Sequence, residues 1–252
     1  MNISNPENRT MTSAAVIGVV GYHNTGKTTL VCRLIERLIE GGYSVSTIKN
    51  IPREDFFMDV QGTDTWKHGE SGARVVVASS PNETSFIVKD TLTFDEMIRI
   101  VDLASSPDLI LVEGHKSEDI PKIVLGDPPI DGDGRRYDPD VDNFEDILDY
   151  ITGIVEINRI YNQLPKMNCG KCGYDDCMDM AEAIFRNEKT LADCVMHNGY
   201  VSATVGGKEV PMGPFVQDIV SKTIAGMISS LKGVGYADID SDIVIRIRHE
   251  HD

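Results

Sequence analysis

The chain has 252 residues, of which 41% are hydrophobic, and this is enough for a sizeable core and for more than one domain. Its 24 basic and 40 acidic residues leave a formal charge of −16, which repels nucleic acid, so we expect no nucleic-acid partner. The longest apolar run, residues 14–20, is too short to cross a membrane. The first thirteen residues lack the apolar core of a signal peptide, so we expect a cytoplasmic protein without a membrane partner.

A phosphate-binding loop follows the first predicted strand. Residues 14–20 are apolar and largely β-branched, which is typical of a buried strand, and residues 21–29 match the pattern G-x-x-x-x-G-K-[ST]. A helix is predicted next, because apolar residues recur on one face before Gly41 and Gly42. Strand, loop and helix thus come in the order that the motif requires. The alternative is a glycine turn that only caps a helix, which does not need the Gly-Lys-Thr triplet.

The chemistry of this loop predicts a nucleotide site. Glycines let backbone amides approach phosphate oxygens, and the helix N-terminus adds positive potential. Lys27 is expected to reach the β- and γ-phosphates as a catalytic group, and the hydroxyl of Thr28 to bind Mg²⁺. The residues expected to bind the nucleotide, GTP or ATP, lie on the loop and the first helical turn: Gly21, Asn24, Thr25, Gly26, Lys27, Thr28 and Thr29.

Strands and helices alternate in the next hundred residues. Strands are predicted at 43–49, 74–78, 84–88, 108–114 and 121–125, and a helix at 93–104. This alternation predicts an α/β fold, a P-loop NTPase-type mainly parallel sheet.

Two acidic regions of this part of the chain are candidates for the nucleotide site. Glu113 ends an apolar strand at the edge of a parallel sheet where ligands bind, so we expect it to be catalytic, by holding Mg²⁺ through water or orienting an attacking water. Its alternative role is to order the local loop. The charged segment 51–70 is interpreted as a switch loop near the γ-phosphate, or as a solvated surface loop. Asp59 and Asp64 in this segment are candidate metal ligands.

The five cysteines fall into two groups. Cys32 is alone in the first helix and is expected to be a small buried apolar residue. The other four have the spacing C-x₂-C-x₄-C-x₁₆-C, which in a reducing compartment indicates metal rather than disulfides. Three thiolates on a glycine loop can bind three corners of an iron–sulfur cubane, and the fourth would come from beyond a helix at 178–187. Structural zinc is the alternative, although zinc ribbons usually pair two C-x₂-C knuckles.

Four stretches carry a resemblance to a known family: residues 21–30, residues 47–50, residues 59–73, and residues 108–114 together with 121–125. Together they resemble the MobB family, the accessory proteins of molybdopterin-guanine dinucleotide biosynthesis. The resemblance implies a GTP-binding, weakly hydrolytic homodimer that assists the nucleotidyltransferase joining GMP to molybdopterin. Asn50 stands where the family usually has histidine, and no Asn-Lys-x-Asp motif is present to read guanine.

A second resemblance covers the cysteine segment. Residues 168–174, Cys177 and residues 181–183 are similar to the four-cysteine [4Fe–4S] domain of corrinoid iron–sulfur proteins and of RnfB-type electron-transfer subunits. This similarity implies a low-potential [4Fe–4S] cluster. Its implied ligands are the four clustered cysteines: Cys169, Cys172, Cys177 and Cys194.

We therefore expect four segments. Residues 12–125 are a nucleotide-binding domain, 126–146 an acidic linker, 147–197 a helix plus the Fe–S module, and 198–252 a small α+β piece. The last segment is predicted to hold a hairpin at 200–210, a helix opened by Pro214 and a half-buried strand at 243–248. Met227 is expected to face the core from that helix.

The expected function is that of a GTP-binding accessory protein, with weak GTPase activity, for the biosynthesis or delivery of a molybdenum or tungsten pterin-guanine dinucleotide cofactor. Its expected partners are the nucleotidyltransferase of that synthesis, a molybdenum or tungsten enzyme, or both. One alternative is a nucleotide-driven electron donor that reductively activates a metalloenzyme. Another is a structural adaptor in which both sites are static.

Overall fold

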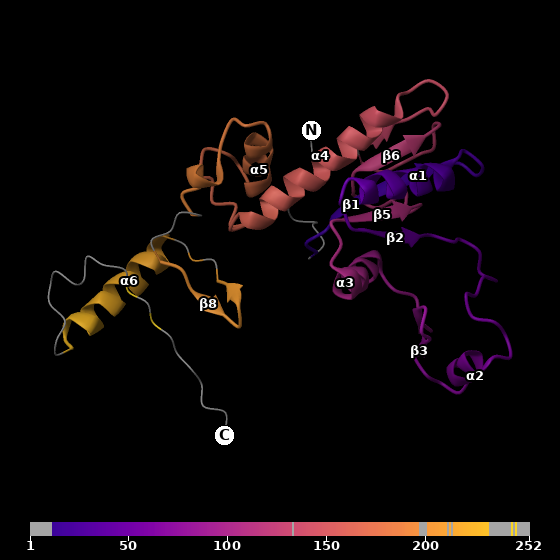
Figure 1. The fold of residues 1–252 in the computed structure, drawn as a ribbon, viewed down its shortest axis with the longest axis horizontal. Coiled ribbons are helices and arrows are strands. Elements are labelled where there is room, and N and C mark those ends of the chain that lie inside the picture. The colour runs from indigo at the N-terminus through magenta and orange to yellow at the C-terminus, as the bar shows by residue number, and fades with distance from the viewer. Residues whose placement is uncertain are drawn as a thin grey trace. The chain divides into compact units, whose positions relative to one another are not determined.

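The structure is a computed structural model that describes residues 12–132, 134–196, 201–210, 212, 214–231, 243 and 245. The chain divides into two compact units, Met1–Arg159 and Ile160–Asp252 (Figure 1). Among the described residues, no helix is both long and apolar enough to span a bilayer.

A parallel sheet of five strands forms the centre of the first unit. The strand order is β2-β5-β1-β6-β7, with every neighbouring pair parallel. The bounds of these strands are Ala15–Gly21 for β1, Val45–Lys49 for β2, Leu109–Glu113 for β5, Lys122–Leu125 for β6 and Gly134–Arg136 for β7. The predicted α/β class with a mainly parallel sheet is confirmed.

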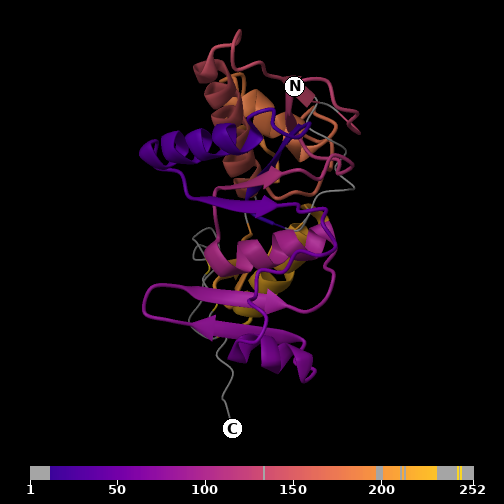
Figure 2. The same cartoon turned by 90° about the vertical axis from the view of Figure 1, so that its right-hand side faces the viewer.

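Helices cover both faces of this sheet. Successive residues of a strand point to opposite faces, and in β5 the residues on both faces are apolar and need to be covered. Leu109 and Leu111 pack in one core with α1 (Lys27–Glu40) and α4 (Phe144–Gln163). Ile110 and Val112 pack in a second core with α3 (Phe94–Ser105). Figure 2 shows α1 and α3 on opposite sides of the strands. With both faces covered, β5 reads as a continuous apolar run rather than an alternating one.

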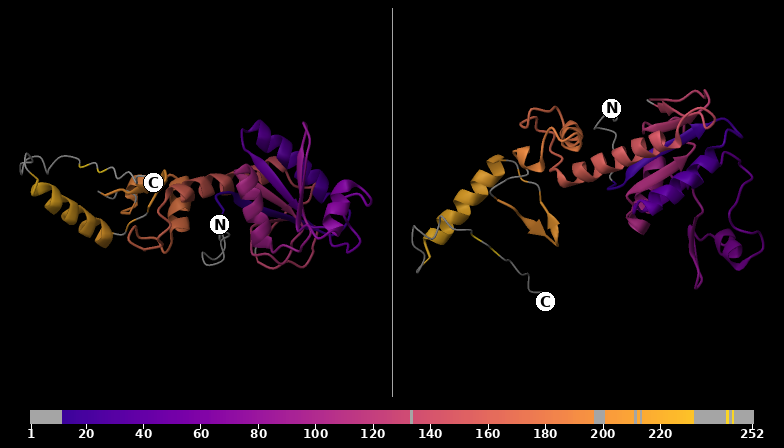
Figure 3. Two further views of the ribbon diagram at one scale, coloured as in Figure 1. Left: turned by 90° about the horizontal axis from the view of Figure 1, so that it is seen from below. Right: turned by 45° about the horizontal axis from the view of Figure 1, so that its top comes forward.

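A small lobe stands apart from the main sheet (Figures 1 and 3). Strands β3 (Val75–Ser79) and β4 (Thr84–Val88) form an antiparallel hairpin of their own, beside the short helix α2 (Asp64–Glu70). Both strands were predicted, but they do not join the parallel sheet. Helix α2 was not predicted; it begins where the side chain of Thr63 accepts a hydrogen bond from the Trp66 N–H.

The segment expected to be a linker completes the first unit instead. Strand β7 pairs with β6, and the N–H of Tyr137 donates to the Val124 carbonyl at 2.9 Å. Tyr137 is buried, as are Phe144 and Ile151 at the start and middle of α4, in the same core as α1. Prolines and aspartates exclude a helix before Asn143, but they leave room for a three-residue edge strand. The boundary expected at residue 125, and the placement of α4 with the cysteine module, thus differ from the structure.

The second unit contains the cysteine segment and two smaller pieces. Its elements are α5 (Cys177–Phe185), the helical turn η2 (Leu191–Asp193), the hairpin β8–β9 (Thr204–Val205 and Lys208–Glu209) and α6 (Pro214–Ser229). The predicted helix after Cys177, the hairpin and the helix opened by Pro214 are confirmed.

Two predictions of burial are wrong, and one predicted strand is absent at the two of its residues that the structure describes. Met227 is 67% exposed, so its expected place in a core is wrong, and Cys32 is exposed rather than buried. Of the strand predicted at 243–248, Ile243 and Ile245 are described, lie outside any strand and are exposed. The other residues of that prediction lie outside the described part of the chain.

Candidate functional site

The phosphate loop joins the central strand β1 to helix α1. Gly21 ends the strand with no room for a side chain, since an added Cβ would lie 2.7 Å from the Thr25 Oγ1 and 2.9 Å from the Leu125 carbonyl oxygen. Gly26 caps α1 with a φ of 84°, a left-handed conformation that glycine adopts without strain. The loop therefore wraps closely around the N-terminus of a 14-residue helix, where free N–H groups attract anions.

Lys27 closes the loop on itself. Its ammonium donates a hydrogen bond to the carbonyl of Tyr22, and the hydroxyl of Thr25 donates to the same carbonyl. Partial burial lowers the pKa of Lys27, Glu113 opposes this shift, and the like charges of Lys116 and Lys49 add to the lowering. The loop lysine thus lies within the electrostatic reach of two further lysines and one carboxylate.

Thr28, Glu113 and Lys49 form a triangle beside the loop. The Thr28 hydroxyl lies 3.1 Å from both carboxylate oxygens of Glu113. The Lys49 ammonium lies 3.0 Å from Glu113 Oε1 and 3.3 Å from Thr28 Oγ1. Strand register explains the meeting, because Lys49 and Glu113 are Cα partners at the carboxyl ends of β2 and β5. The carboxylate and the hydroxyl offer oxygen atoms of the kind that Mg²⁺ binds.

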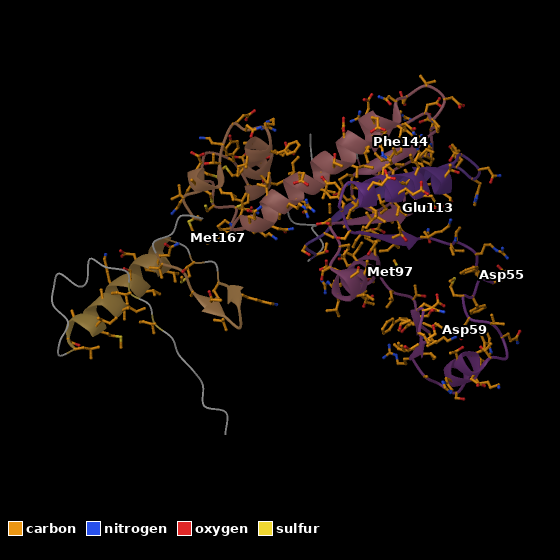
Figure 4. The ribbon with its side chains drawn as sticks, in the orientation of Figure 1. Asp55, Asp59, Met97, Glu113, Phe144 and Met167 are labelled. Carbon is orange, nitrogen blue, oxygen red and sulfur yellow. The ribbon has the colours of Figure 1, made fainter. Side chains whose placement is uncertain are left out.

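Asp59 and Asp64 do not join this triangle. Asp59 accepts hydrogen bonds from Thr65 and Thr63 and pairs with Lys89 at 3.4 Å, in the lobe of α2 and the β3–β4 hairpin. Asp64 pairs with Lys67 one turn along α2. Figure 4 shows Asp59 in that lobe and Glu113 in the main sheet. Both residues thus lie away from Thr28 and Glu113 in sequence position and in their contacts, and their metal-binding role stays a prediction from the sequence.

Two lysines of the site are not indicated by any sequence motif. Lys49 is the last residue of β2, and Lys116 lies in the loop after β5, with its ammonium 5.2 Å from the centre of the Tyr22 ring. Their position at or just after predicted parallel strands could have indicated them. The carboxyl ends of parallel strands meet at one edge of a sheet, so polar residues at these ends converge there. Asn50, which departs from the usual family residue, donates its N–H to the Glu113 carbonyl.

The four clustered cysteines line one cavity in the second unit. Its other walls are mostly apolar and include Pro165, Met167, Met180, Val195 and Met196. Cys177 and Cys194 are buried, Cys172 is half-buried and Cys169 is exposed. Among the described residues, no three His, Cys, Asp or Glu side chains lie close enough together to hold a single metal ion.

Cys177 has the most elaborate surroundings of the four thiols. Burial raises its pKa, the N–H groups of Asn168 and Met167 oppose the rise, and the neighbouring Cys194 and Cys169 add to it. The N–H of Cys177 itself donates to the Asn168 side chain at 3.0 Å. Cys177 is also the first residue of α5, where the helix dipole favours negative charge. Backbone N–H groups and a helix terminus aimed at sulfur fit a negatively charged iron–sulfur cluster.

The sheet with its glycine loop between β1 and α1 defines a nucleotide-binding fold of the P-loop class, followed here by a four-cysteine unit. The family described as "MobB: Molybdopterin guanine dinucleotide synthesis protein B" matches residues 16–134. A second family, described as "FeS: Putative Fe-S cluster", matches residues 164–196. A relative from Methanocaldococcus jannaschii, named "Putative molybdopterin-guanine dinucleotide biosynthesis adapter protein", is 32% identical over 229 residues, covering 87% of this chain and 92% of the relative. The chain belongs to the MobB family of molybdopterin-guanine dinucleotide biosynthesis adapter proteins.

Two further comparisons concern the parts of the chain. The gamma subunit of the acetyl-CoA decarbonylase/synthase complex from Archaeoglobus fulgidus is 49% identical over 36 residues, covering 14% of this chain and 8% of that subunit. A solved structure titled "Crystal Structure of molybdopterin-guanine biosynthesis protein B (mobB)" has 25% identity and a TM-score of 0.38, covering 56% of this chain and 98% of that one.

Proposed function

We propose that the first unit binds GTP with Mg²⁺ and hydrolyses it weakly, in support of the synthesis or delivery of a molybdenum or tungsten pterin-guanine dinucleotide. The observation that carries this proposal is the pairing of Thr28 with Glu113, at 3.1 Å, next to the loop closed by Lys27. The hydroxyl and the carboxylate would hold Mg²⁺, which supplies charge neutralisation for the phosphates. Lys27 would exchange the Tyr22 carbonyl for the β- and γ-phosphates, and Glu113 would orient the attacking water.

Nucleotide binding is tested by isothermal titration of the full chain with GTP and with ATP, each with Mg²⁺. We expect GTP to bind and Lys27→Ala to abolish binding. The control is Lys67→Ala, which removes an exposed lysine in α2, away from the loop. Equal affinity of Lys27→Ala and the wild type would contradict the proposal, and tighter binding of ATP would replace guanine by adenine as the recognised base.

The cofactor role is tested in cells. Deletion of the gene is expected to leave molybdenum or tungsten enzymes short of pterin dinucleotide, and the wild-type gene to restore it. We expect Lys27→Ala not to restore it, since the nucleotide would no longer bind. A normal dinucleotide content in the deletion strain would contradict the proposal. Full restoration by Lys27→Ala would favour the static adaptor instead.

We also propose that Cys169, Cys172, Cys177 and Cys194 bind a [4Fe–4S] cluster. Four thiols around one apolar cavity, with N–H groups directed at Cys177, suit a bound metal centre, and the single C-x₂-C pair in the spacing C-x₂-C-x₄-C-x₁₆-C favours an iron–sulfur cluster over zinc. The test is anaerobic purification with iron, sulfide and zinc analysis and Mössbauer spectroscopy. Stoichiometric zinc without sulfide would contradict this assignment. Cys32→Ser is the matched control, since this cysteine lies outside the cluster and is expected to leave the iron content unchanged.

One observation favours a second candidate, the nucleotide-driven electron donor. Cys169 is exposed and Cys172 half-buried, so that side of the cavity is open to a redox partner. Under this hypothesis the cluster potential shifts when GTP binds. If the reduction potential of the cluster is the same with and without nucleotide, the electron-donor hypothesis is excluded. The cluster would then have a structural or docking role.

The proposed partners are the nucleotidyltransferase of pterin dinucleotide synthesis and the molybdenum or tungsten enzyme that receives the product, in the cytoplasm. We also propose a homodimer. Analytical ultracentrifugation under reducing conditions tests the dimer, and a monomer at micromolar concentration would contradict it.

A further inference from the structure

Lys49 occupies an unusual position for a surface lysine. Its ammonium touches both groups that are suited to a divalent cation, at 3.0 Å from Glu113 Oε1 and 3.3 Å from Thr28 Oγ1. The Lys49 side chain is 51% exposed, whereas the Glu113 side chain is 13% exposed. The carboxylate is thus held in place, and the ammonium reaches it from the solvent side.

The charges around the loop favour a particular ligand. Lys27 interacts electrostatically with Glu113, Lys116 and Lys49. The three lysine ammonium groups and the one carboxylate together carry an excess of two positive charges. A nucleoside triphosphate with its Mg²⁺ carries about two negative charges in excess, which matches this site. An ammonium and a divalent cation cannot share the same two oxygen atoms, however, because like charges a few ångströms apart repel strongly.

From these contacts we propose that Lys49 takes the position of the divalent cation while the site is empty, and leaves it when the metal–nucleotide complex binds. The inference rests on the proposed nucleotide site. The backbone of Lys49 stays fixed in β2, which pairs with β5. The flexible four-carbon side chain of Lys49 carries its ammonium from Glu113 and Thr28 to the phosphates. Lys49 is therefore a positioning residue that keeps Thr28 and Glu113 oriented toward a common point.

The alternative hypothesis is that Lys49 and Glu113 form an ion pair with no role in metal binding. Without the Lys49 charge, Glu113 still accepts a hydrogen bond from the Thr28 hydroxyl, so we expect the fold to stay intact under either hypothesis. The two readings differ in how nucleotide affinity depends on Mg²⁺. If Lys49 competes with the metal, its removal strengthens the metal's contribution; if it is an ordinary pair, that contribution stays unchanged.

The test is the variant Lys49→Met, which keeps an unbranched side chain one atom shorter than lysine and removes its charge. The dissociation constant for GTP is measured in EDTA and in Mg²⁺, and the ratio of the two constants is compared with that of the wild type. We expect the ratio to rise about tenfold, because metal-free binding loses a cation, whereas in metal-supported binding the loss of that cation is offset by the loss of a competitor for the metal position. Lys49→Arg, which retains the charge, is expected to bring metal-free binding back toward the wild type.

Lys116→Met is the matched control. It removes one positive charge that also acts on Lys27, from an ammonium that lies over the Tyr22 ring instead of on Thr28 and Glu113. We expect both constants to weaken in parallel, with little change in their ratio. Equal ratios for Lys49→Met and Lys116→Met would overturn the inference and leave Lys49 a general source of charge.

A second measurement separates this inference from the nucleotide proposal. The nucleotide-free protein is titrated with Mn²⁺ and followed by electron paramagnetic resonance. Tighter Mn²⁺ binding by Lys49→Met than by the wild type and by Lys116→Met supports the inference even if GTP fails to bind. Equal Mn²⁺ affinity in all three proteins overturns it, even if GTP binds as proposed.

Discussion

Arg37 in α1 and Glu145 in α4 form a two-point contact, with guanidinium-to-carboxylate distances of 2.6 and 3.0 Å. The two residues are 108 positions apart in the sequence. Next to them the Arg33 guanidinium lies 3.8 Å from the centre of the Phe144 ring. The start of α4 is thus fixed on α1 by a polar contact outside and an aromatic ring inside.

We expect Phe144→Ala to destabilise the first unit by about 3 kcal/mol, because the ring is 4% exposed and its loss leaves a cavity. Glu145→Gln is expected to change stability little, since both partners of the ion pair are substantially exposed. Urea unfolding of the two variants checks this order. A larger loss for Glu145→Gln than for Phe144→Ala would show that the ion pair, and not the buried ring, holds α4.

Gly21→Ala is expected to abolish nucleotide binding. A methyl group there would meet the Thr25 hydroxyl and the Leu125 carbonyl at less than 3 Å, so the loop or β6 must move. The matched control is Gly226→Ala, where nothing lies within 4 Å of the added atom and helix α6 gains a better helix former. Titration with GTP and thermal unfolding give both readouts, and wild-type binding by Gly21→Ala would contradict the loop geometry.

The network around Asp108 predicts a pH dependence of stability. Burial acts to raise the pKa of Asp108, but hydrogen bonds from the Ser44 N–H, from Arg159 and from the Ser44 hydroxyl together hold it below its ordinary value of 3.8. Because the folded-state pKa is the lower one, Asp108 stabilises the fold fully above about pH 4 and loses this contribution as the pH falls further.

Asp108→Asn is therefore expected to be less stable than the wild type at neutral pH, with the difference shrinking below about pH 4. Urea unfolding at several pH values measures both proteins. A difference that grows on acidification would contradict the assignment. Asp95→Asn, in the exposed first turn of α3, is a suitable control.

Asn168 is expected to control the stability of the proposed iron–sulfur cluster. Its backbone is left-handed, with a φ of 44°, its side chain accepts the Cys177 N–H, and its own N–H is directed at the Cys177 thiol. Asn168→Gly retains the backbone conformation and loses only the side-chain acceptor, whereas Asn168→Ala loses both. We expect the half-life of the visible absorbance in air to fall in the order wild type, Asn168→Gly, Asn168→Ala. Identical half-lives would remove Asn168 from the cluster's support.

Local patterns predicted the parts of the site that are close in sequence. The run from β1 through Gly26 to α1, and the spacing from Cys169 to Cys194, carry their geometry within short segments. Contacts between distant segments were not predictable in this way. The Lys49–Glu113 pair depends on the register of two parallel strands, and β7 is a three-residue strand recognisable only beside β6. An alternating pattern also could not show that β3 and β4 form their own hairpin.

The position of β1 between β5 and β6 has a consequence for biosynthesis of the chain. This first strand is translated well before either neighbour, since its partners are Leu109–Glu113 and Lys122–Leu125. Until Glu113 has left the ribosome, β1 has no neighbouring strand to pair with, and until Leu125 has left it, the Leu125 carbonyl is not yet in place beside Gly21. The nascent chain therefore completes the strands around its phosphate loop late, and β1 needs shielding from other apolar segments until then.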